Sequence, residues 1–437
     1  MEGFFIFDIY HTKGMKNVFQ LVLLTLYFFI FLISESTLNL YLSWDRIMPQ
    51  FLFLSILNTL TFAHLLRNNL LLTTINSALK EKIIICYSLF IAVCFVSIFF
   101  AINISESIVS FSQYLTYLLS FIAIYSISKS IGKIFLKCFI FFSVSALFIE
   151  SSSIVYNAID RVLIDEQVFK RDNFFLRTFT GNINIAANSI VSKIMVVYLI
   201  IYTYKDKRLV YLSYVLLFIA FSALFILLTR SAFLSLALLT LVMISFNYKK
   251  IFTRSVPLVV VVLIGYFFVN TTFNTENPDE ISSRINSIAL NTEDDSINER
   301  LGYYSDASKS IMQYPVFGIG IGNWKIKSIE YARNTIAGYT VPYHTHNDFL
   351  QISAEIGVIG GLLYLLIYLI PLYQILIKLK DGVLDNLNLV YLLIISAILI
   401  DSMLNFPIAR PVNHIFLLFT MVAMLQTSKT NFHNEST

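Results

Sequence analysis

Long uninterrupted apolar runs constrain this chain more than any other feature of its sequence. A helix needs about 20 mostly apolar residues to cross the hydrocarbon core of a bilayer. Twelve runs come close to this length, and only 13% of the residues are charged, against about 25% in soluble domains. The sequence therefore predicts an all-α integral membrane protein with about 12 transmembrane helices.

The predicted spans are joined by short polar connections, with one long exception. The twelve runs cover residues 17–34, 49–66, 82–101, 108–127, 133–154, 183–203, 209–228, 231–247, 254–270, 353–377, 387–404 and 411–427. This pattern divides the chain into residues 1–270 with the first nine spans, residues 271–352 as one large polar loop with short helices, and residues 353–437 with the last three spans and a C-terminal tail.

The positive residues indicate which side each connection faces, because Lys and Arg are enriched in cytoplasmic loops. Every second connection is rich in them: Lys13, Lys16, Arg67, Lys80, Lys82, Lys129, Lys133, Lys137, Lys205, Lys207, Arg208, Lys249, Lys250, Arg254, Lys378, Lys380 and Lys429. The other short connections contain Arg46, Arg230 and Arg410. We therefore expect both termini to be cytoplasmic and the segments 155–182 and 271–352 to lie outside.

Several ionisable residues fall at the outer ends of predicted spans. Each needs a physical reason, since a charged group at the bilayer centre costs about 2.5 kcal/mol or more. These residues are Glu150, Arg230, Asp401, Arg410 and His414, with Lys193 deeper in its span. Together with Arg300 and His346 of the long loop, they predict one cavity that opens outward. The alternatives are arginines anchored at lipid headgroups, carboxylates that pair with nearby cations or cap helices, and a histidine that hydrogen-bonds between helices.

Two histidines stand one residue apart in VPYHTHNDFLQ, just before a predicted span. His344 to Asp348 match the first five positions of the HxHxDH zinc motif of metallo-β-lactamase-like hydrolases. Phe349 stands where that motif needs its next histidine, so we expect no metal. Two interpretations remain, structural hydrogen bonds to loop carbonyls and a general base, since a neutral imidazole with a pKa of about 6.5 accepts a hydroxyl proton at ambient pH.

Two glycine patterns lie near these histidines. In GIGIG, residues 318–322, the third glycine of a dinucleotide fingerprint is replaced by Asn323. The chain contains no P-loop either, so we expect no cofactor, no nucleotide partner and no nucleic acid partner. Gly357 and Gly361 form a small-xxx-small pair, which predicts close helix packing.

The long loop resembles the C-terminal signature of the O-antigen ligase and Wzy polymerase superfamily. RLGYYSDASKSIMQYPVFGIGIGNW (300–324) and HNDFLQISAEIGVIGG (346–361) follow its order of arginine, amphipathic helix, proline with glycine-rich turn, HN-x-aromatic-L and glutamate-glycine. The matching residues are Arg300, Pro315, His346, Asn347, Glu355 and Gly357. FTGNINIAANSI (179–190), LLTRSAFLSL (227–236) and LNFPIARP (404–411) are also similar to the family, so the resemblance covers about residues 170–425.

This resemblance implies a glycosyltransferase that takes a glycan from undecaprenyl diphosphate at the periplasmic face of the bacterial inner membrane. In ligases of this family the acceptor is the lipid A-core, and the reaction inverts the anomeric centre without metal or nucleotide. The family's catalytic histidine falls on His346, its loop arginine on Arg300 and its turn arginine on Arg230. Thr229 and Ser231 depart from the family's serine-arginine-glycine turn, which puts the local backbone in doubt.

We expect the arginines to hold the diphosphate, because guanidinium groups bind such oxygens bidentately. Further candidates for substrate binding are His344, Asn347, Arg410, Asn182 and Asn184. The surrounding partner is membrane lipid.

The sequence leaves the acceptor open. A Wzy-type polymerase would join one lipid-linked glycan to another, and a protein O-oligosaccharyltransferase would use a protein acceptor. A polytopic transporter or flippase accounts for the spans as well, but not for a long loop with an arginine and a histidine at matched positions.

Overall fold

The computed structural model describes residues 14–33, 47–160, 174–273, 295–333, 342–380 and 385–427, and every regular element in these ranges is helical. The α-helices are α2 (Gly14–Phe28), α4 (Met48–Arg67), α5 (Leu71–Ala78), α6 (Lys82–Ser97), α7 (Ile104–Ile131), α8 (Ile134–Ile159), α9 (Ile183–Thr203), α10 (Lys207–Leu227), α11 (Arg230–Phe246), α12 (Val256–Thr272), α14 (Asp295–Gln313), α15 (Trp324–Ala332), α16 (Asp348–Lys380), α17 (Asn386–Leu404) and α18 (Pro411–Thr427). Short 3-10 or π helices are η1 (Phe29–Leu32), η2 (Ile98–Phe100), η4 (Phe174–Thr180), η5 (Tyr248–Lys250), η6 (Ile251–Ser255) and η7 (Pro407–Ala409).

The described helices coincide with the predicted spans. Among the described residues, nine helices are long and apolar enough to cross a membrane. Three shorter apolar helices, Val18–Leu32, Arg230–Phe246 and Pro411–Thr427, match the other three runs. The all-α class is therefore confirmed for this part of the chain, and the total of about 12 crossings stays a prediction.

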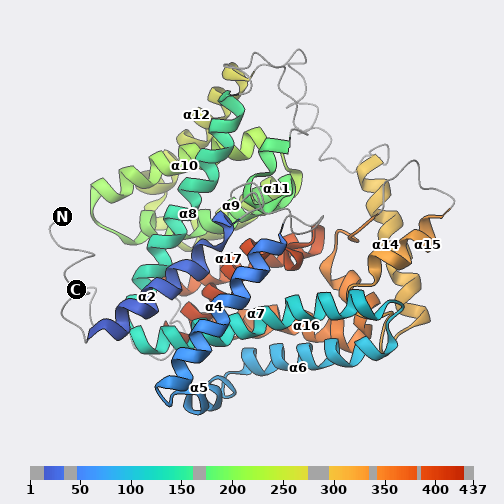
Figure 1. The fold of residues 1–437 in the computed structure, drawn as a ribbon. Helices are drawn as coiled ribbons and strands as arrows, with labels where there is room; N and C mark the ends of the chain where they lie inside the picture. Colours follow the sequence, from blue (N-terminus) through green and yellow to red (C-terminus); the bar gives the residue numbers. More distant parts are fainter. Residues whose placement is uncertain are drawn as a thin grey trace.

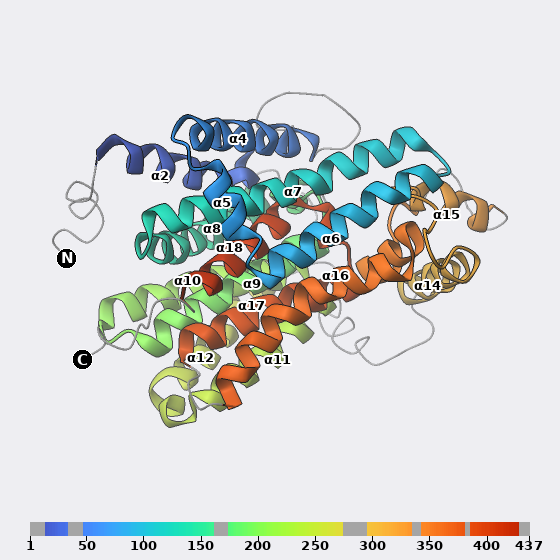
Figure 2. The same cartoon turned by 90° about the horizontal axis from the view of Figure 1, so that it is seen from below.

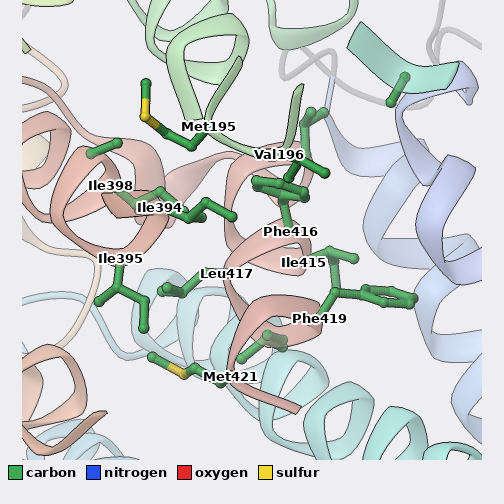
Figure 3. Close-up of a cluster of buried hydrophobic side chains, with 14 of the residues drawn as sticks. Met195, Val196, Ile394, Ile395, Ile398, Ile415, Phe416, Leu417, Phe419 and Met421 are labelled. Atoms are coloured by element: carbon green, nitrogen blue, oxygen red, sulfur yellow. The ribbon is translucent and has the colours of Figure 1, made fainter. Parts of the chain in front are cut away.

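Helices α9 and α18 form the centre of the bundle. In α9, 94% of an 18-residue stretch is buried, against 22% for the stretch in 252–272 that contains α12. Met195 and Val196 of α9 pack in one cluster with residues 394–398 of α17 and 415–421 of α18 (Figure 3). A helix that is apolar on all sides belongs in such a position, since it needs no face toward water.

The helices run back and forth between two ends of the bundle. At one end, which we call the loop end, α14 and α15 lie beside the ends of α6, α7 and α16 (Figures 1 and 2). At the opposite end, Tyr125 of α7 donates to Glu81 before α6 at 2.8 Å, and Lys378 of α16 donates to Asn388 of α17 at 3.0 Å. The side of the membrane that each end faces stays a prediction. Lys13, Arg46, Lys429 and residues 274–294 lie outside the described residues.

Helix α16 is broken near its start. Ile356 and Gly357 have backbone angles that are not helical, and Gly357 has a φ of +80°. A Cβ atom at Gly357 would lie 2.1 Å from the carbonyl oxygen of Val316. The interpretation of Gly357 and Gly361 as a packing pair on one helix is therefore wrong for Gly357, because this residue interrupts the helix and lets another backbone approach.

Residues 315–322 dock into this break, and we call the contact between 315–322 and 354–358 the clasp. A break in a helix leaves carbonyl and N–H groups that need partners. The clasp supplies them through backbone hydrogen bonds: Ile319 N–H to Ala354 O at 3.1 Å, Gly320 N–H to Glu355 O at 2.8 Å and Val358 N–H to Pro315 O at 2.9 Å. The carboxylate of Glu355 also accepts from the N–H groups of Gly322 at 2.8 Å and Trp324 at 3.1 Å. The GIGIG pattern thus serves this close backbone contact.

We predict that Gly357→Ala loosens the clasp, because a side chain at this φ costs about 1–3 kcal/mol and meets Val316. The expected result is a lower unfolding temperature and a red-shifted emission from Trp324, whose side chain is fully buried beside the clasp. Fluorescence of the Trp44→Phe background, which leaves Trp324 as the single tryptophan, measures both.

The matched control is Gly302→Ala in α14, where a new Cβ meets nothing within 4 Å. This change should leave the emission unchanged and raise stability slightly, since alanine is favoured over glycine in a helix by about 0.5–1 kcal/mol. Equal behaviour of the two variants would contradict the proposed role of Gly357.

Candidate active site

The histidine stretch ends in a helix cap. Asn347 Oδ1 accepts from the N–H of Leu350 at 3.1 Å, so Asn347 caps the start of α16. Thr345 Oγ1 accepts from the Asn347 N–H at 3.1 Å and donates to the Asn347 carbonyl at 2.7 Å. Asparagine is among the best capping residues because its side chain satisfies a free N–H of the first turn. The cap fixes the backbone on which both histidines stand.

Helix α14 holds His346 from the other side. Tyr304 Oη donates to the carbonyl oxygen of His346 at 3.1 Å. The ring of Tyr303 lies nearly parallel to the His346 imidazole, with centroids 6.4 Å apart and planes at 16°. His346 has a φ of +57°, a left-handed conformation that is rare outside glycine. Such a backbone outlier is more common where function constrains the chain.

Phe406, in the connection between α17 and α18, lies between the two histidines. Its ring stacks on His344, with centroids 4.0 Å apart, and meets His346 edge-on at 5.1 Å. The Arg410 guanidinium carbon is 5.4 Å from the centroid of the same ring. Sequence reasoning missed Phe406 as a site residue. The available signal was its place beside Pro407 in the LNFPIARP stretch.

Arg230 is held against α9. It is half-buried at the start of α11, and its two neighbours bond to asparagines of α9. Thr229 Oγ1 donates to Asn184 Oδ1 at 3.4 Å, and Ser231 Oγ accepts from the side-chain amide of Asn188 at 3.3 Å. Asn184 therefore supports the arginine turn, a role that its spacing from Arg230 does not reveal in the sequence.

Asn182 and Arg410 meet near the start of α9. Asn182 Oδ1 accepts from the N–H groups of Asn184 at 2.9 Å and Ile185 at 3.2 Å, so it caps α9. A Cβ at the preceding residue, Gly181, would lie 3.6 Å from Nη1 of Arg410. Arg410 therefore reaches from the Phe406 ring to the α9 cap, and it links the histidine side of the loop end with the Arg230 side.

Both histidines are kept neutral. Burial and, to a smaller extent, the nearby charge of Arg300 lower the pKa of His346 to about 4, while the Asn405 side chain opposes the shift. Burial also lowers the pKa of His344 to about 3, with a second contribution from Arg410. A different arginine thus lowers the pKa of each histidine. Each imidazole is unprotonated at neutral pH and able to accept a proton.

A cavity of about 650 Å³ lies on the His344 side of Phe406. Its walls come from the start of α4, the start of α7, residues 322–325, residues 343–355 and residues 408–410. Of the predicted site residues, His344 and Arg410 line it. The other predicted site residues are not part of its lining: His346, Arg300, Arg230, Asn347, Asn182 and Asn184.

Comparison with known proteins places this region in a family. Residues 215–365 match the family described as O-Antigen ligase. We call this segment the ligase domain, because it is the part of the chain that is similar to this family. It runs from α10 into α16 and contains Arg230, Arg300, both histidines and the clasp. The resemblance to the O-antigen ligase and Wzy superfamily is confirmed. A search of curated proteins finds no match.

The apolar helices indicate a multi-pass membrane protein, and the matched segment is similar to a glycosyltransferase-like family. The matched segment ends before α17, so Phe406 and Arg410 lie outside it. The cavity beside His344 is therefore built partly from the ligase domain and partly from the rest of the chain.

The remaining ionisable groups are buried among the helices that support the ligase domain. Lys193 of α9 forms an ion pair with Glu150 of α8 at 3.0 Å, so each of these two charged side chains has a partner inside the bundle. Asp401 accepts from the side-chain amides of Asn405 at 2.7 Å and Asn413 at 3.3 Å.

His414 is buried as well, and its Nε2 lies 2.7 Å from Tyr87 Oη. These residues, predicted to ring one cavity with Arg410, are not in the lining of the cavity described above: Glu150, Lys193, Asp401 and His414. Within the described ranges, no three His, Cys, Asp or Glu side chains come together as a metal site would require.

We predict that Arg300→Gln raises the pKa of His346, because the nearby positive charge that disfavours the imidazolium is removed. The pKa should stay below its ordinary value, since burial is the larger cause. Arg410→Gln, the matched control, should raise the pKa of His344 instead. Ring-labelled histidine NMR, assigned with a His346→Gln variant, measures both values.

The same shifts predict a pH dependence of stability. Between pH 6.5 and about 4 the unfolded chain binds protons at these histidines that the folded chain does not, so stability falls as the pH falls through this window.

For the arginine substitutions, a His346 titration that is identical with and without Arg300 would contradict the effect of Arg300 on the pKa of His346.

Proposed function

We propose that this protein is an O-antigen ligase-like glycosyltransferase. It moves a glycan from undecaprenyl diphosphate to a lipid A-core acceptor at the periplasmic face of the bacterial inner membrane, with inversion and without metal or nucleotide. The observation that carries the proposal is a half-buried, neutral His346 near Arg300, both within the segment that matches the O-antigen ligase family.

In this reaction the acceptor hydroxyl oxygen attacks the anomeric carbon, and the bond from that carbon to the diphosphate oxygen breaks. The proton of the hydroxyl passes to His346, and the bonding pair leaves with the undecaprenyl diphosphate. The donor already carries an activated bond, so the transfer needs no further energy source. The new glycosidic bond forms on the face opposite the leaving group, which gives inversion.

Arg300 and Arg230 are proposed to hold the diphosphate, since fixed guanidinium groups stabilise its growing charge without reorganising. This contact also tunes the base. An anion bound beside Arg300 offsets the charge that lowers the pKa of His346, so the imidazole becomes a stronger base once the donor is in place. Arg410 and Asn184 support the arrangement from the α9 side.

The position of His346 also fits a base with an orienting group. Asn405 lies beside the imidazole, and its side-chain amide donates to Asp401 at 2.7 Å. A base that is oriented by a second residue, itself held by a third, is a common arrangement in covalent and general-base catalysis. Asn347 contributes indirectly, through the cap that sets the left-handed backbone of His346.

We predict that His346→Ala lowers glycan transfer by about 10²- to 10⁴-fold, the usual contribution of a general base. Transfer is measured with membranes that contain the variant, the lipid-linked donor and the lipid A-core. His64→Ala is the matched control, because His64 lies near the end of α4 at the opposite end of the bundle, and it should transfer normally. Near-normal transfer by His346→Ala at equal abundance would remove the assignment.

The acceptor is tested by deleting the gene and separating the surface glycans by gel. A ligase deletion should leave bare lipid A-core, with long chains kept on the lipid carrier. Core capped by a single repeat would assign a Wzy-type polymerase instead, and loss of glycan from proteins with an intact core would assign a protein O-oligosaccharyltransferase. Unchanged glycans on both would favour a transporter.

A further inference from the structure

The cavity on the His344 side of Phe406 is unused by the mechanism above, yet it is built from polar groups of four separate segments. Glu106 of α7 and Lys325 of α15 form an ion pair across its wall at 2.6 Å, and both are about one-third exposed. Gln113 of α7 and Gln351 of α16 add two side-chain amides. The wall therefore offers hydrogen-bond donors beside acceptors over a short distance.

The ionisable groups of the lining are engaged by other groups of the protein. Glu106 is paired with Lys325 at 2.6 Å, and the guanidinium carbon of Arg410 lies 5.4 Å from the centroid of the Phe406 ring. Asp348 accepts from the Ile408 N–H at 3.1 Å, and Glu355 accepts from two backbone N–H groups. The backbone therefore holds these two carboxyl groups in place, and they add fixed polar groups to the wall.

The cavity also offers apolar contact. The side chain of Tyr343 is 61% exposed and lines the cavity, which leaves an aromatic ring available to a ligand. Ile47, Met48 and Val109 cover another part of the wall. A sugar ring has hydroxyl groups that both donate and accept, and C–H faces that pack on an aromatic ring, so it matches this mixture of polar and apolar groups.

The cavity reaches the reaction centre through one side chain. The Phe406 ring touches His344 on one side at 4.0 Å and His346 on another at 5.1 Å. A ligand against His344 is therefore separated from the proposed base by two stacked rings, those of His344 and Phe406. At 650 Å³ the cavity lies within the range of about 300–1,000 Å³ that is usual for small-molecule sites.

We propose that this cavity is a saccharide subsite, which binds neutral sugar rings of a glycan substrate next to the transfer centre. This inference rests on the proposed function, because it assigns the cavity to one of the two glycans that the reaction joins. The donor glycan and the acceptor glycan share the chemistry that the lining recognises, and the test separates them.

The test places a cysteine in the cavity of the full-length protein. Gln113→Cys and Ser110→Cys both line it, whereas Ser105→Cys, on the exposed side of the same helix, is the control. The native Cys86, Cys94 and Cys138 are buried, so the unmodified chain gives the background rate of alkylation by a water-soluble maleimide. Three probes are added in turn: glycan released from the donor by mild acid, core oligosaccharide released from lipid A-core, and inorganic diphosphate.

At a saccharide concentration ten times its Kd, labelling of the cavity cysteines should slow about tenfold, because only about one molecule in eleven is unoccupied. Labelling of Ser105→Cys should not change. Protection by the donor glycan assigns the cavity to the donor, and protection by the core oligosaccharide assigns it to the acceptor. Either result supports the proposal.

Protection by diphosphate alone, or no protection by either saccharide in variants that still transfer glycan, would overturn it. The readout is independent of catalysis. If neither saccharide protects the cysteines but His346→Ala still lowers transfer as predicted, the subsite is wrong and the proposed function stands. If a saccharide protects the cysteines but the protein transfers no glycan, the proposed function is wrong and the cavity is still a saccharide-binding site.

Discussion

The break in α16 is the constraint on which the loop end depends. Inside a membrane protein, a helix can be interrupted only where its freed backbone groups find other partners. Around Ile356 and Gly357 those partners come from residues 315–320, which lie 35 to 43 residues earlier in the chain than the groups they bond. The clasp therefore satisfies backbone groups of both segments at once.

The clasp positions residues of both the histidine stretch and the cavity. It fixes α14 against the histidine stretch, where Tyr304 bonds to the backbone of His346, and it brings Lys325 at the start of α15 to the cavity wall opposite Glu106. Glu355 joins the two effects, since its carboxylate caps the start of α15 and also lines the cavity. One backbone contact thus organises the proposed base and the proposed sugar subsite together.

Several features were predictable from the sequence because they depend on local pattern. The length of the apolar runs located the helices within a few residues, since crossing lipid requires that length. The helices at 183–203 and 411–427 are examples. The motif order identified the ligase domain that includes Arg300 and His346. The partner of Lys193 was not predictable, because Glu150 lies 43 residues away and only helix packing brings the two side chains within 3.0 Å.

The sequence by itself determined the helical class, the positions of the apolar helices and the residue types available for chemistry, because these follow from hydrophobicity and from neighbours along the chain. Only the tertiary structure decided that Gly357 breaks a helix, that Phe406 separates two histidines and that His344 faces a cavity that His346 does not line. These outcomes depend on backbone and ring contacts between segments far apart in sequence, whose geometry no local pattern encodes.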